Sequence, residues 1–553
     1  MPQFDDISKK VAELRHLEEE ELIKTLSTKY GHQYINLYGL AINTEALRLV
    51  AEGTAREAEF AIFARAGIKL SVALRNPNKK EALAIIESLK SRNFSVLIFM
   101  ASTASLEHAW ERYHDVVETT ASEHGAVGIT TEAIAHMAET LKTVKDVAQT
   151  VTGISDGDSR HNISSVLTAL LGGALSLGAS DMHIEPEEKQ TRIRYRLDGV
   201  LWDVVMVSAR VSELLRTRLK LLAGVKVNIG NRAQDGRFTI RIGQKEYEIR
   251  VSILPSAYGE AVTMRFLDPS SITIDIKDFG INPFLLAVIE EELKRPNGCI
   301  ITTGPAGSGK TTALYAFLRK IHTPEVKIIT IEDPIEYHLE GIVQTQISES
   351  YTFASGLRSI LRQDPNVIMV GEIRDDEVAE TAMNAALTGH LVFSTLHTNN
   401  AAGAFPRLRD LRVDPRTMGS ALNLIMAQRL VRVLCPHCKK PRSLSVKEKA
   451  QFIATLQNYP APISVENTSI YDSVGCDQCG GSGFKGRIGI YEGIRMTPAV
   501  AEVIVDNLQE NAVLAAALPQ KIPTMAQDGI EKVLNGITSL DELGRVVDLQ
   551  IDT

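Results

Sequence analysis

One segment, residues 300–312, constrains the fold of this 553-residue chain more than any other. An apolar, β-branched run at 300–303 leads into a turn that is rich in glycine. Beyond the turn, Leu314, Phe317 and Ile321 recur at the spacing of one helix face. The segment therefore predicts a strand, a tight loop and a helix, in that order.

The loop has the composition that a bound triphosphate requires. Glycine lets the main chain curl, so that backbone N–H groups can converge on phosphate oxygens. Lys310 is placed to reach the β- and γ-phosphates and Thr311 to hold Mg²⁺, at the positive end of the following helix. A chance glycine-rich turn is the alternative, but the flanking strand and helix patterns argue against it. We expect ATP and Mg²⁺ to be bound by Gly304, Gly307, Ser308, Gly309, Lys310, Thr311 and Thr312.

A second apolar run, 328–331, delivers three acids to the loop that follows it: Glu332, Asp333 and Glu336. In open α/β sheets, ligands bind at the carboxyl ends of the strands. Hydrolysis of ATP needs a group that positions water in line with the γ-phosphate, and a carboxylate beside the phosphate loop can do this. The alternative is that these acids only stabilise a turn, where Asp side chains commonly accept backbone hydrogen bonds.

Two more apolar runs end beside side chains that suit a nucleotide site. The run 367–370 leads to Glu372, and an acid in that place orients Mg²⁺ through water in Walker-type sites. The run 391–395 lies between His390 and His397. A single histidine is usually structural, but two that bracket a strand of a nucleotide sheet favour phosphate sensing or subunit coupling for at least one of them.

Four of the five cysteines form two C-x2-C pairs, separated by a long insertion that predicts a helix at 446–456. Thiols stay reduced in the cytosol, so paired knuckles of this form indicate a tetrahedral structural Zn²⁺ site. Two unrelated redox pairs are the alternative. The fifth cysteine, Cys299, precedes the phosphate loop and is expected in the core. The predicted metal ligands are Cys435, Cys438, Cys476 and Cys479.

Composition narrows the class of protein. A net charge of −8 argues against a surface shaped for bulk nucleic-acid binding. The acidic amino terminus, residues 1–6, does not resemble a secretory signal, so we expect a cytoplasmic protein. Residues 162–180 carry no charge but are interrupted by small and polar residues, which predicts a helix packed inside a domain instead of a membrane span. Any membrane association would then be indirect, through a partner.

Composition also shifts along the chain. The first part alternates short apolar runs with helical patterns and has no catalytic cluster, so it predicts a small α/β docking domain. A polar, glycine-containing stretch follows and predicts a linker. In the next part, Arg192, Arg194 and Arg196 share one strand face, most simply a solvated one, whereas Arg250 and Arg265 stand alone in ordinary strands. The predicted boundaries are 1–118 for the docking domain, 119–160 for the linker, 161–268 for an arginine-bearing α/β domain and 269–553 for the catalytic domain, with the cysteine module at 430–490.

Together these segments resemble the secretion-type ATPases that power type IV pilus assembly and type II secretion. The resemblance extends over nearly the whole chain, because it includes blocks far outside the phosphate loop. They are Gly178-Ala179-Ser180-Asp181-Met182-His183-Ile184-Glu185-Pro186, Tyr195-Arg196-Leu197-Asp198-Gly199, Gln234-Asp235-Gly236-Arg237, Ile331-Glu332-Asp333-Pro334-Ile335-Glu336, Gly371-Glu372-Ile373-Arg374-Asp375 and Ser394-Thr395-Leu396-His397-Thr398-Asn399.

The resemblance implies roles that spacing alone does not. It makes Glu336 the catalytic carboxylate, Glu372 the Walker B acid and His397 the residue that faces the γ-phosphate. Arg250 and Arg265 would act on nucleotide across a subunit boundary, as arginine fingers. The implied fold is α/β and multidomain, with a RecA-like core, a PAS-like α/β domain before it, a small amino-terminal α/β domain and a zinc-binding insertion.

The resemblance also implies partners. It predicts a homo-hexamer that acts on an inner-membrane platform protein and cytoplasmic assembly proteins, so the chain would be peripheral to the inner membrane. Retraction motors lack the amino-terminal domain and the four cysteines, which favours assembly or secretion, and overall length leans to the pilus. Residues 11–17 do not reproduce the motif by which some relatives bind a cyclic dinucleotide. A nucleotide-gated scaffold and a nucleic-acid translocase remain as other classes, although the acidic balance argues against the second.

Overall fold

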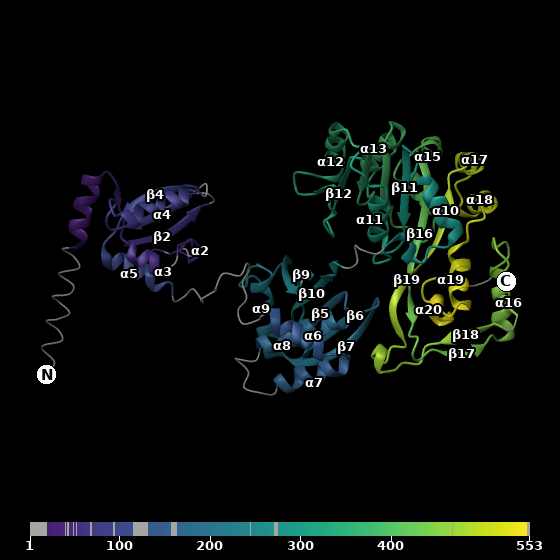
Figure 1. The fold of residues 1–553 in the computed structure, drawn as a ribbon, viewed down its shortest axis with the longest axis horizontal. Coiled ribbons are helices and arrows are strands. Elements are labelled where there is room, and N and C mark those ends of the chain that lie inside the picture. Colours follow the sequence, from purple (N-terminus) through teal and green to yellow (C-terminus); the bar gives the residue numbers. More distant parts are fainter. Residues whose placement is uncertain are drawn as a thin grey trace. The chain divides into compact units, whose positions relative to one another are not determined.

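The computed structural model describes residues 19–113, 131–155 and 163–549, except for 39, 41, 43, 48, 51, 67–68, 92–93, 244, 270–274 and 467. The stretch 11–17, considered above for cyclic dinucleotide binding, lies outside the described residues. The chain divides into two compact units, Met1–Gly125 and Ala126–Thr553 (Figure 1).

The first unit contains a four-stranded sheet in the order β1-β4-β3-β2. Strand β4 pairs parallel with β3, and helix α4 connects them, whereas β2 and β3 form an antiparallel pair. The indole N–H of Trp110 donates to the backbone carbonyl of Phe60 (3.0 Å), which ties α5 to the sheet. The elements are β1 Gln33–Tyr34, α2 Thr44–Leu47, α3 Glu52–Glu57, β2 Phe60–Ala66, β3 Lys69–Leu74, α4 Lys80–Ser91, β4 Ser95–Met100 and α5 Thr103–Glu111.

The second unit begins with an antiparallel sheet in the order β7-β6-β5-β10-β9-β8. Its buried face packs against helices in a single hydrophobic cluster that includes Tyr195 and Leu170, and the Tyr195 hydroxyl donates to the Leu170 carbonyl (2.6 Å). The elements are α6 Thr131–Thr140, α7 Val144–Ser155, α8 Ile163–Ser176, β5 Asp181–Pro186, β6 Gln190–Leu197, β7 Val200–Ser208, α9 Ala209–Leu222, β8 Gln234–Ile242, β9 Lys245–Ser256 and β10 Gly259–Leu267.

The range 119–160, expected to be a linker, contributes two helices to this cluster instead. Ile134 of α6 and Val147 of α7 are buried against α8. Glycine makes the close approach possible: a Cβ at Gly172 would lie 2.6 Å from Met137, and one at Gly173 would lie 2.5 Å from Val147. Residues 131–155 therefore belong to the core of this domain.

Helix α8 occupies the uncharged stretch expected to be a packed helix, and nine of its residues are buried inside the domain. Among the described residues, no helix combines the length and the hydropathy that crossing a bilayer would require. The three arginines of β6 lie beside acids: Arg192 pairs with Glu187 (2.8 Å), Arg194 with Glu185 (2.6 Å) and Arg196 with Asp181 (3.2 Å).

The larger part of the second unit is built on a seven-stranded sheet in the order β13-β12-β14-β15-β11-β16-β19. All neighbouring pairs run parallel except β16 and β19. The strands are β11 Gly298–Thr303, β12 Ile328–Glu332, β13 Val343–Gln346, β14 Val367–Val370, β15 Leu391–Leu396, β16 Leu422–Leu434 and β19 Phe484–Arg495. The predicted phosphate-loop strand and the three runs that end near Glu332, Glu372 and His397 are thus β11, β12, β14 and β15.

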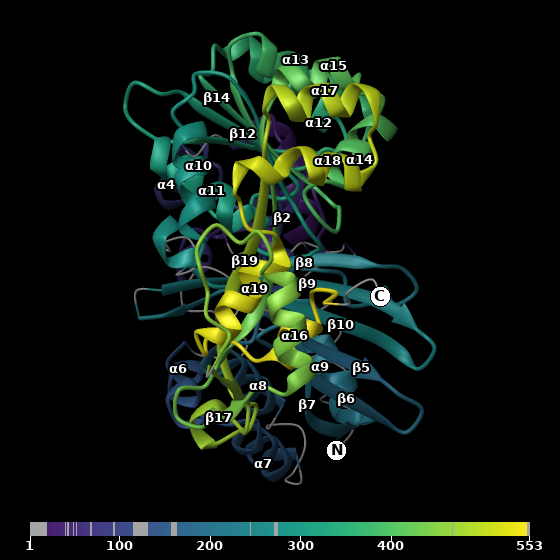
Figure 2. The same ribbon diagram turned by 90° about the vertical axis from the view of Figure 1, so that its right-hand side faces the viewer.

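Helices cover both faces of this sheet, as Figure 2 shows, because its central strands are apolar on both sides. Ile300 and Phe393 face the cluster formed with α10 and α11, whereas Ile301 and Val392 face the larger cluster. The helices are α10 Pro283–Glu292, α11 Lys310–Ile321, α12 Phe353–Ile360, α13 Asp376–Leu387, α14 Ala404–Asp410, α15 Pro415–Ala421, α17 Pro498–Asp506, α18 Glu510–Ala517, α19 Met525–Leu534 and α20 Leu540–Gly544.

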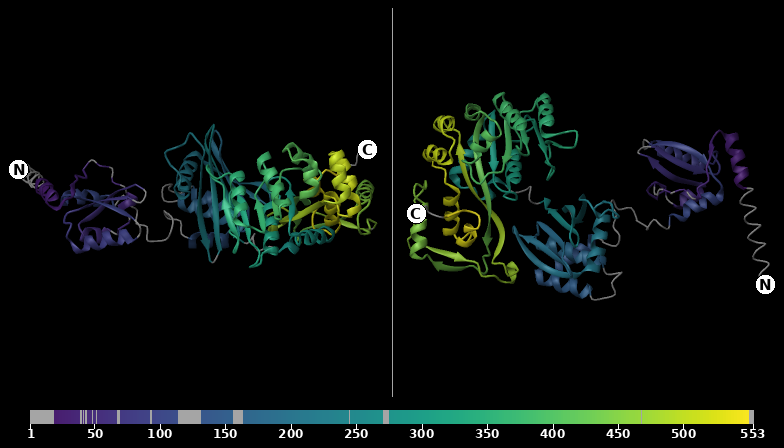
Figure 3. Two further views of the ribbon diagram at one scale, coloured as in Figure 1. Left: turned by 90° about the horizontal axis from the view of Figure 1, so that it is seen from above. Right: turned by 180° about the vertical axis from the view of Figure 1, so that it is seen from behind.

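The long strands β16 and β19 lead to the cysteine-bearing insertion, which contains β17 Lys440–Ser443, α16 Val446–Thr455 and β18 Ser469–Asp472. Helix α16 confirms the helix expected between the two cysteine pairs. Figure 3 shows the carboxy-terminal helices, in yellow, beside these green strands. A buried ion pair on α19, Lys532 with Asp528 (2.7 Å), lies there, and Asp528 also accepts the Tyr491 N–H of β19 (2.8 Å).

Candidate nucleotide site and metal centre

The phosphate loop follows β11, and helix α11 begins at Lys310 with no side-chain cap on its first N–H groups. Gly304, Gly307 and Gly309 all have positive φ, at 148°, 76° and 87°. A Cβ on Gly304 would lie 2.4 Å from the Gln428 carbonyl oxygen, so this position has no room for another residue. The loop thus has the open helix terminus and the backbone that phosphate binding requires.

Two polar groups of the loop lack an external partner. The Lys310 ammonium is buried and donates to the carbonyls of Gly304 (2.6 Å) and Pro305 (3.0 Å) within the loop. Burial lowers the pKa of Lys310, and the Glu372 carboxylate partly opposes this. The Ser308 hydroxyl is buried and has no hydrogen-bond partner among the described residues. These groups fit a phosphate ligand, which would supply the missing acceptor oxygens.

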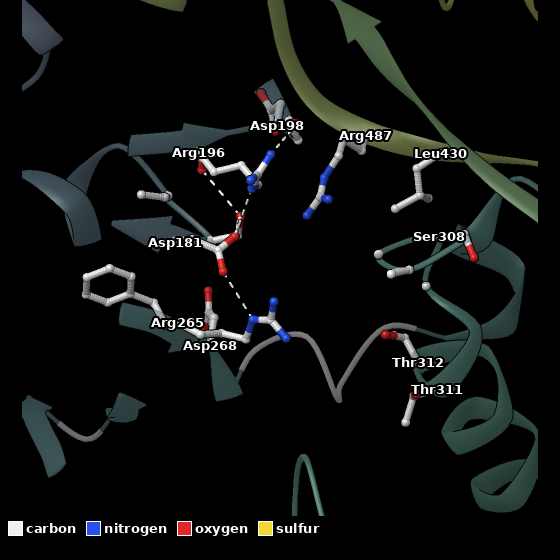
Figure 4. Close-up of a pocket in the computed structure, with 18 of the residues that line it drawn as sticks. Asp181, Arg196, Asp198, Arg265, Asp268, Ser308, Thr311, Thr312, Leu430 and Arg487 are labelled. Carbon is white, nitrogen blue, oxygen red and sulfur yellow. Dashed lines mark hydrogen bonds and ion pairs between the residues drawn. The ribbon is translucent and has the colours of Figure 1, made fainter. Parts of the chain in front are cut away.

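A pocket of about 910 Å³ lies between the phosphate loop and the six-stranded sheet. Thr311 and Thr312 line it on the side of the phosphate loop, and Arg265 lines it from β10 (Figure 4). Glu336, on the loop after β12, lines it as well. A volume of this size is in the range of small-molecule and cofactor sites. The arginines that line the pocket are Arg196, Arg265, Arg429, Arg487 and Arg545.

Asp181 holds two of these arginines in place. Strand register sets it directly opposite Arg265 on β10 and Arg196 on β6. Its Oδ1 lies 3.1 Å from the Arg265 Nε, and its Oδ2 lies 3.2 Å from the Arg196 Nε. Both contacts use Nε, as Figure 4 shows, which leaves the terminal N–H groups of Arg265 directed toward the pocket.

Arg250, on β9, reaches the loop after β12. Its Nη1 lies 2.9 Å from the Glu336 Oε2, and its Nη2 donates to the Ile335 carbonyl (2.5 Å). Both predicted finger arginines therefore lie beside the nucleotide site of their own chain. Their action across a subunit boundary stays a prediction.

Glu372 and His397 come together at the ends of neighbouring strands β14 and β15. The His397 Nε2 lies 3.5 Å from the Glu372 Oε2, and Arg374 pairs with the other Glu372 oxygen. Burial lowers the pKa of the His397 imidazole; Lys310 adds to this effect and Glu372 opposes it. The pair lies near the phosphate-loop lysine, as a metal-orienting acid and a phosphate-facing histidine would.

Two residues that the sequence placed near the site have structural contacts instead. Glu332 is buried and accepts hydrogen bonds from Tyr315, Thr330 (2.6 Å) and Gln344 (3.1 Å). The His390 Nδ1 lies 3.0 Å from the Ala385 carbonyl at the end of α13. Of the candidate acids and histidines, the ones near the phosphate loop are Glu336, Glu372 and His397.

The four cysteines form a second, separate cluster. Their Sγ atoms all lie within 4.8 Å of one another, with separations of 3.9 Å for Cys435 to Cys476 and 3.8 Å for both Cys438 to Cys479 and Cys476 to Cys479. A tetrahedron with zinc–sulfur bonds of about 2.3 Å has edges of about 3.8 Å, so the set fits Zn²⁺. Although burial raises it, backbone N–H groups of Cys476 and Gly483 bring the pKa of Cys479 down to about 6, which favours the thiolate. Cys299 lies apart in the core, as expected.

Three further arginines that the sequence does not mark line the pocket: Arg429, Arg487 and Arg545. They come from β16, from β19 and from the end of α20, and Figure 4 shows the Arg487 guanidinium directed into the pocket. No local pattern marks them, because they meet the phosphate loop only through the tertiary fold. The net charge of the whole chain, which is negative, conceals this local excess of arginine.

Comparisons with known proteins agree with this geometry. A family model described as Type II/IV secretion system protein matches residues 156–545. The type IV pilus assembly ATPase PilB of Myxococcus xanthus is 35% identical over 530 residues, which cover 95% of this chain and 91% of that protein. The type II secretion system protein E of Aeromonas hydrophila is 43% identical over 393 residues, which cover 71% of this chain and 77% of that protein.

A solved structure is similar as well. The X-ray structure of the ATPase DotB from Yersinia pseudotuberculosis aligns with a TM-score of 0.51 at 21% identity, and the match covers 70% of this chain and 94% of that chain. At this identity the likeness concerns the fold alone.

Proposed function

We propose that this chain, which belongs to the Type II/IV secretion system protein family and is an ATPase, hydrolyses ATP to drive assembly of type IV pilus subunits. One observation carries the choice of pilus assembly: the match to the pilus assembly ATPase spans 95% of the chain and so includes the amino-terminal unit. The match to the type II secretion protein spans 71%. The proposed partners are an inner-membrane platform protein and cytoplasmic assembly proteins, with no nucleic acid.

The nucleotide would bind with its phosphates on the loop and on the first residues of α11. Lys310 would exchange the loop carbonyls for the β- and γ-phosphate oxygens, because charged oxygens are stronger acceptors. Thr311 would hold Mg²⁺ and Glu372 would orient it; the bound ion would neutralise charge on the phosphates. ATP and Mg²⁺ thus have ligands in the residues present.

Glu336 is the proposed catalytic carboxylate, which orients water and accepts its proton in line with the γ-phosphate. His397 would face the γ-phosphate. Arg250 and Arg265 would neutralise the charge that spreads over the transferring phosphoryl group. Their contacts within one chain favour action in cis, on the nucleotide bound by the same chain.

The proposed assembly is a homo-hexamer, cytoplasmic and held at the inner membrane by partners. The cysteine module would bind structural Zn²⁺, since all four ligand positions are filled by thiols and none is left for substrate. The domain boundaries proposed from sequence remain 1–118, 161–268 and 269–553, with residues 131–155 joined to the second of these.

The test is steady-state ATP hydrolysis by the full chain, with its mass in solution, for wild type, Glu336→Ala and Glu340→Ala. Glu340 is an exposed acid on the same loop, so its variant controls for loss of charge. We expect a hexamer with Mg²⁺-dependent turnover, lost in Glu336→Ala and kept in Glu340→Ala. Wild type that binds ATP without hydrolysing it or assembling would overturn the motor in favour of a nucleotide-gated scaffold.

Powering of type II secretion is the second candidate, favoured by the higher identity of 43% to the type II secretion protein. A strain that lacks the protein distinguishes the two candidate functions. Loss of surface pili with normal export supports the pilus, whereas loss of exported proteins with normal pili supports secretion.

A further inference from the structure

Glu332 is a buried carboxylate that the proposed mechanism does not use. It is 2% exposed, and no basic side chain among the described residues forms an ion pair with it. Burial of a carboxylate is costly unless hydrogen bonds satisfy its oxygens. Here Tyr315 donates to one oxygen, and Thr330 and Gln344 donate to the other.

The donors connect Glu332 to both halves of the nucleotide site. Tyr315 lies on α11, whose first residues form the end of the phosphate loop. Gln344 lies on β13, the edge strand of the sheet, which pairs with β12. The Gln344 Nε2 also donates to the Tyr337 carbonyl (2.9 Å), and its Oε1 accepts the Leu339 N–H (2.7 Å). Gln344 therefore fixes the segment that follows Glu336.

The residue before Glu336 is held in the same way. The Gln346 Oε1 of β13 accepts the Ile335 N–H (3.3 Å). The Tyr315 hydroxyl is close to this segment too: burial and Glu332 raise the pKa of Tyr315, and backbone groups of Tyr337 and Glu336 partly oppose this. The hydroxyl thus lies between the buried acid and the backbone of the proposed catalytic residue.

We propose that Tyr315, Glu332 and Gln344 are positioning residues that set the distance between Glu336 and the phosphate loop. This rests on the proposed role of Glu336. Because Tyr315 shares α11 with Lys310, a shift of that helix when phosphate binds would reach the segment after Glu336 through three hydrogen bonds: Tyr315 to Glu332, Gln344 to Glu332, and Gln344 to the Tyr337 carbonyl. Small displacements of a catalytic group cost large factors in rate, so this linkage would decide whether Glu336 is aligned.

The test measures kcat and KM for ATP in Tyr315→Phe and Glu332→Gln, each alone and combined with Glu336→Gln. Tyr315→Phe should lower kcat about tenfold, with KM and the nucleotide Kd within about twofold, because it keeps the ring and removes one hydrogen bond. In the Glu336→Gln background it should cause no further loss, since the residue it positions is already disabled. Gln344→Leu is the alternative variant if Tyr315→Phe or Glu332→Gln does not fold. It should lower kcat by a similar factor.

Tyr491→Phe is the matched control, because Tyr491 is also fully buried in this domain but its hydroxyl donates to the Phe279 carbonyl (3.3 Å), away from Glu336. Its kcat should equal that of wild type. The positioning role would be overturned if Tyr315→Phe lowered kcat by the same factor in wild type and in Glu336→Gln. A rise in KM with unchanged kcat would also overturn it. If Glu336→Gln itself hydrolyses ATP at the wild-type rate, the catalytic role of Glu336 fails instead. If the wild type does not hydrolyse ATP, the proposed function fails, so the outcomes are distinguishable.

Discussion

The Nη1 of Arg250 lies 2.9 Å from the Oε2 of Glu336, so a proposed finger arginine and the proposed catalytic carboxylate form an ion pair within one chain. The two side chains come from β9 and from the loop after β12, which are distant in sequence. The pair uses only Oε2, so the other carboxylate oxygen does not take part in it. The contact therefore sets the orientation of Glu336 relative to β9.

A mixing experiment decides whether Arg250 acts in cis. In each of Arg250→Ala and Glu336→Ala, ATP turnover should fall by at least about 10²-fold, since an arginine finger contributes a factor of 10³ or more in related chemistry. If both residues serve the site of their own chain, every site in a mixed assembly lacks one of them, and turnover stays low. Recovery toward a quarter of the wild-type rate in an equal mixture would instead place Arg250 in a neighbour's site. Arg241→Ala, on the exposed pair with Glu246, should leave turnover unchanged.

Asp181→Asn should release Arg265 and Arg196 from their present orientation, because the amide retains one acceptor oxygen and loses the charge. We expect KM for ATP to rise and kcat to fall, together by about tenfold in kcat/KM. The matched control is Asp203→Asn, since Asp203 is an exposed partner of Arg192 at 3.9 Å on the same sheet. Equal kinetics for the two variants would contradict an orienting role for Asp181.

The pH dependence of turnover should contain a limb due to His397. Its pKa is lowered from 6.5, chiefly by burial, so the imidazole is neutral at pH 7 and gains its proton only below 6.5. The unfolded chain takes up that proton first, so His397 makes folding less favourable as pH falls from 6.5 toward its native pKa. Turnover should fall in the same window as the charge beside Lys310 changes. In His397→Gln this fall in turnover at low pH should be absent. If the variant has the same pH profile as wild type, another titrating group causes the fall.

Metal analysis of the purified chain should find one Zn²⁺ per chain, and Cys476→Ser should remove it. Loss of the ion should lower the melting temperature, because the metal ties the two cysteine-bearing segments together. Cys299→Ala should retain the metal, since Cys299 is a buried core residue. A chain that holds no zinc, with disulfides in the cysteine pairs, would contradict the structural metal site.

Many of the candidate site residues could be proposed from the sequence, because they belong to motifs of residues close together in the chain. The spacing of the phosphate loop, the acids and histidines at strand ends and the two cysteine pairs all follow from local sequence. Glu332 shows the limit: its position in the acidic loop resembled that of Glu336, and only its burial against Tyr315 separates the two. The packing of α6 and α7 in the core could not be predicted from sequence. It depends on the close approach of these helices to Gly172 and Gly173 of α8, which is a tertiary contact.

Strand β16 passes the phosphate loop at Gln428 and ends one residue before Cys435. At about 3.3 Å per residue, the two points are roughly 23 Å apart along one continuous strand. One strand thus joins the edge of the phosphate loop to the first cysteine of the cysteine module, so the two sites share a backbone although they lie in different parts of the domain.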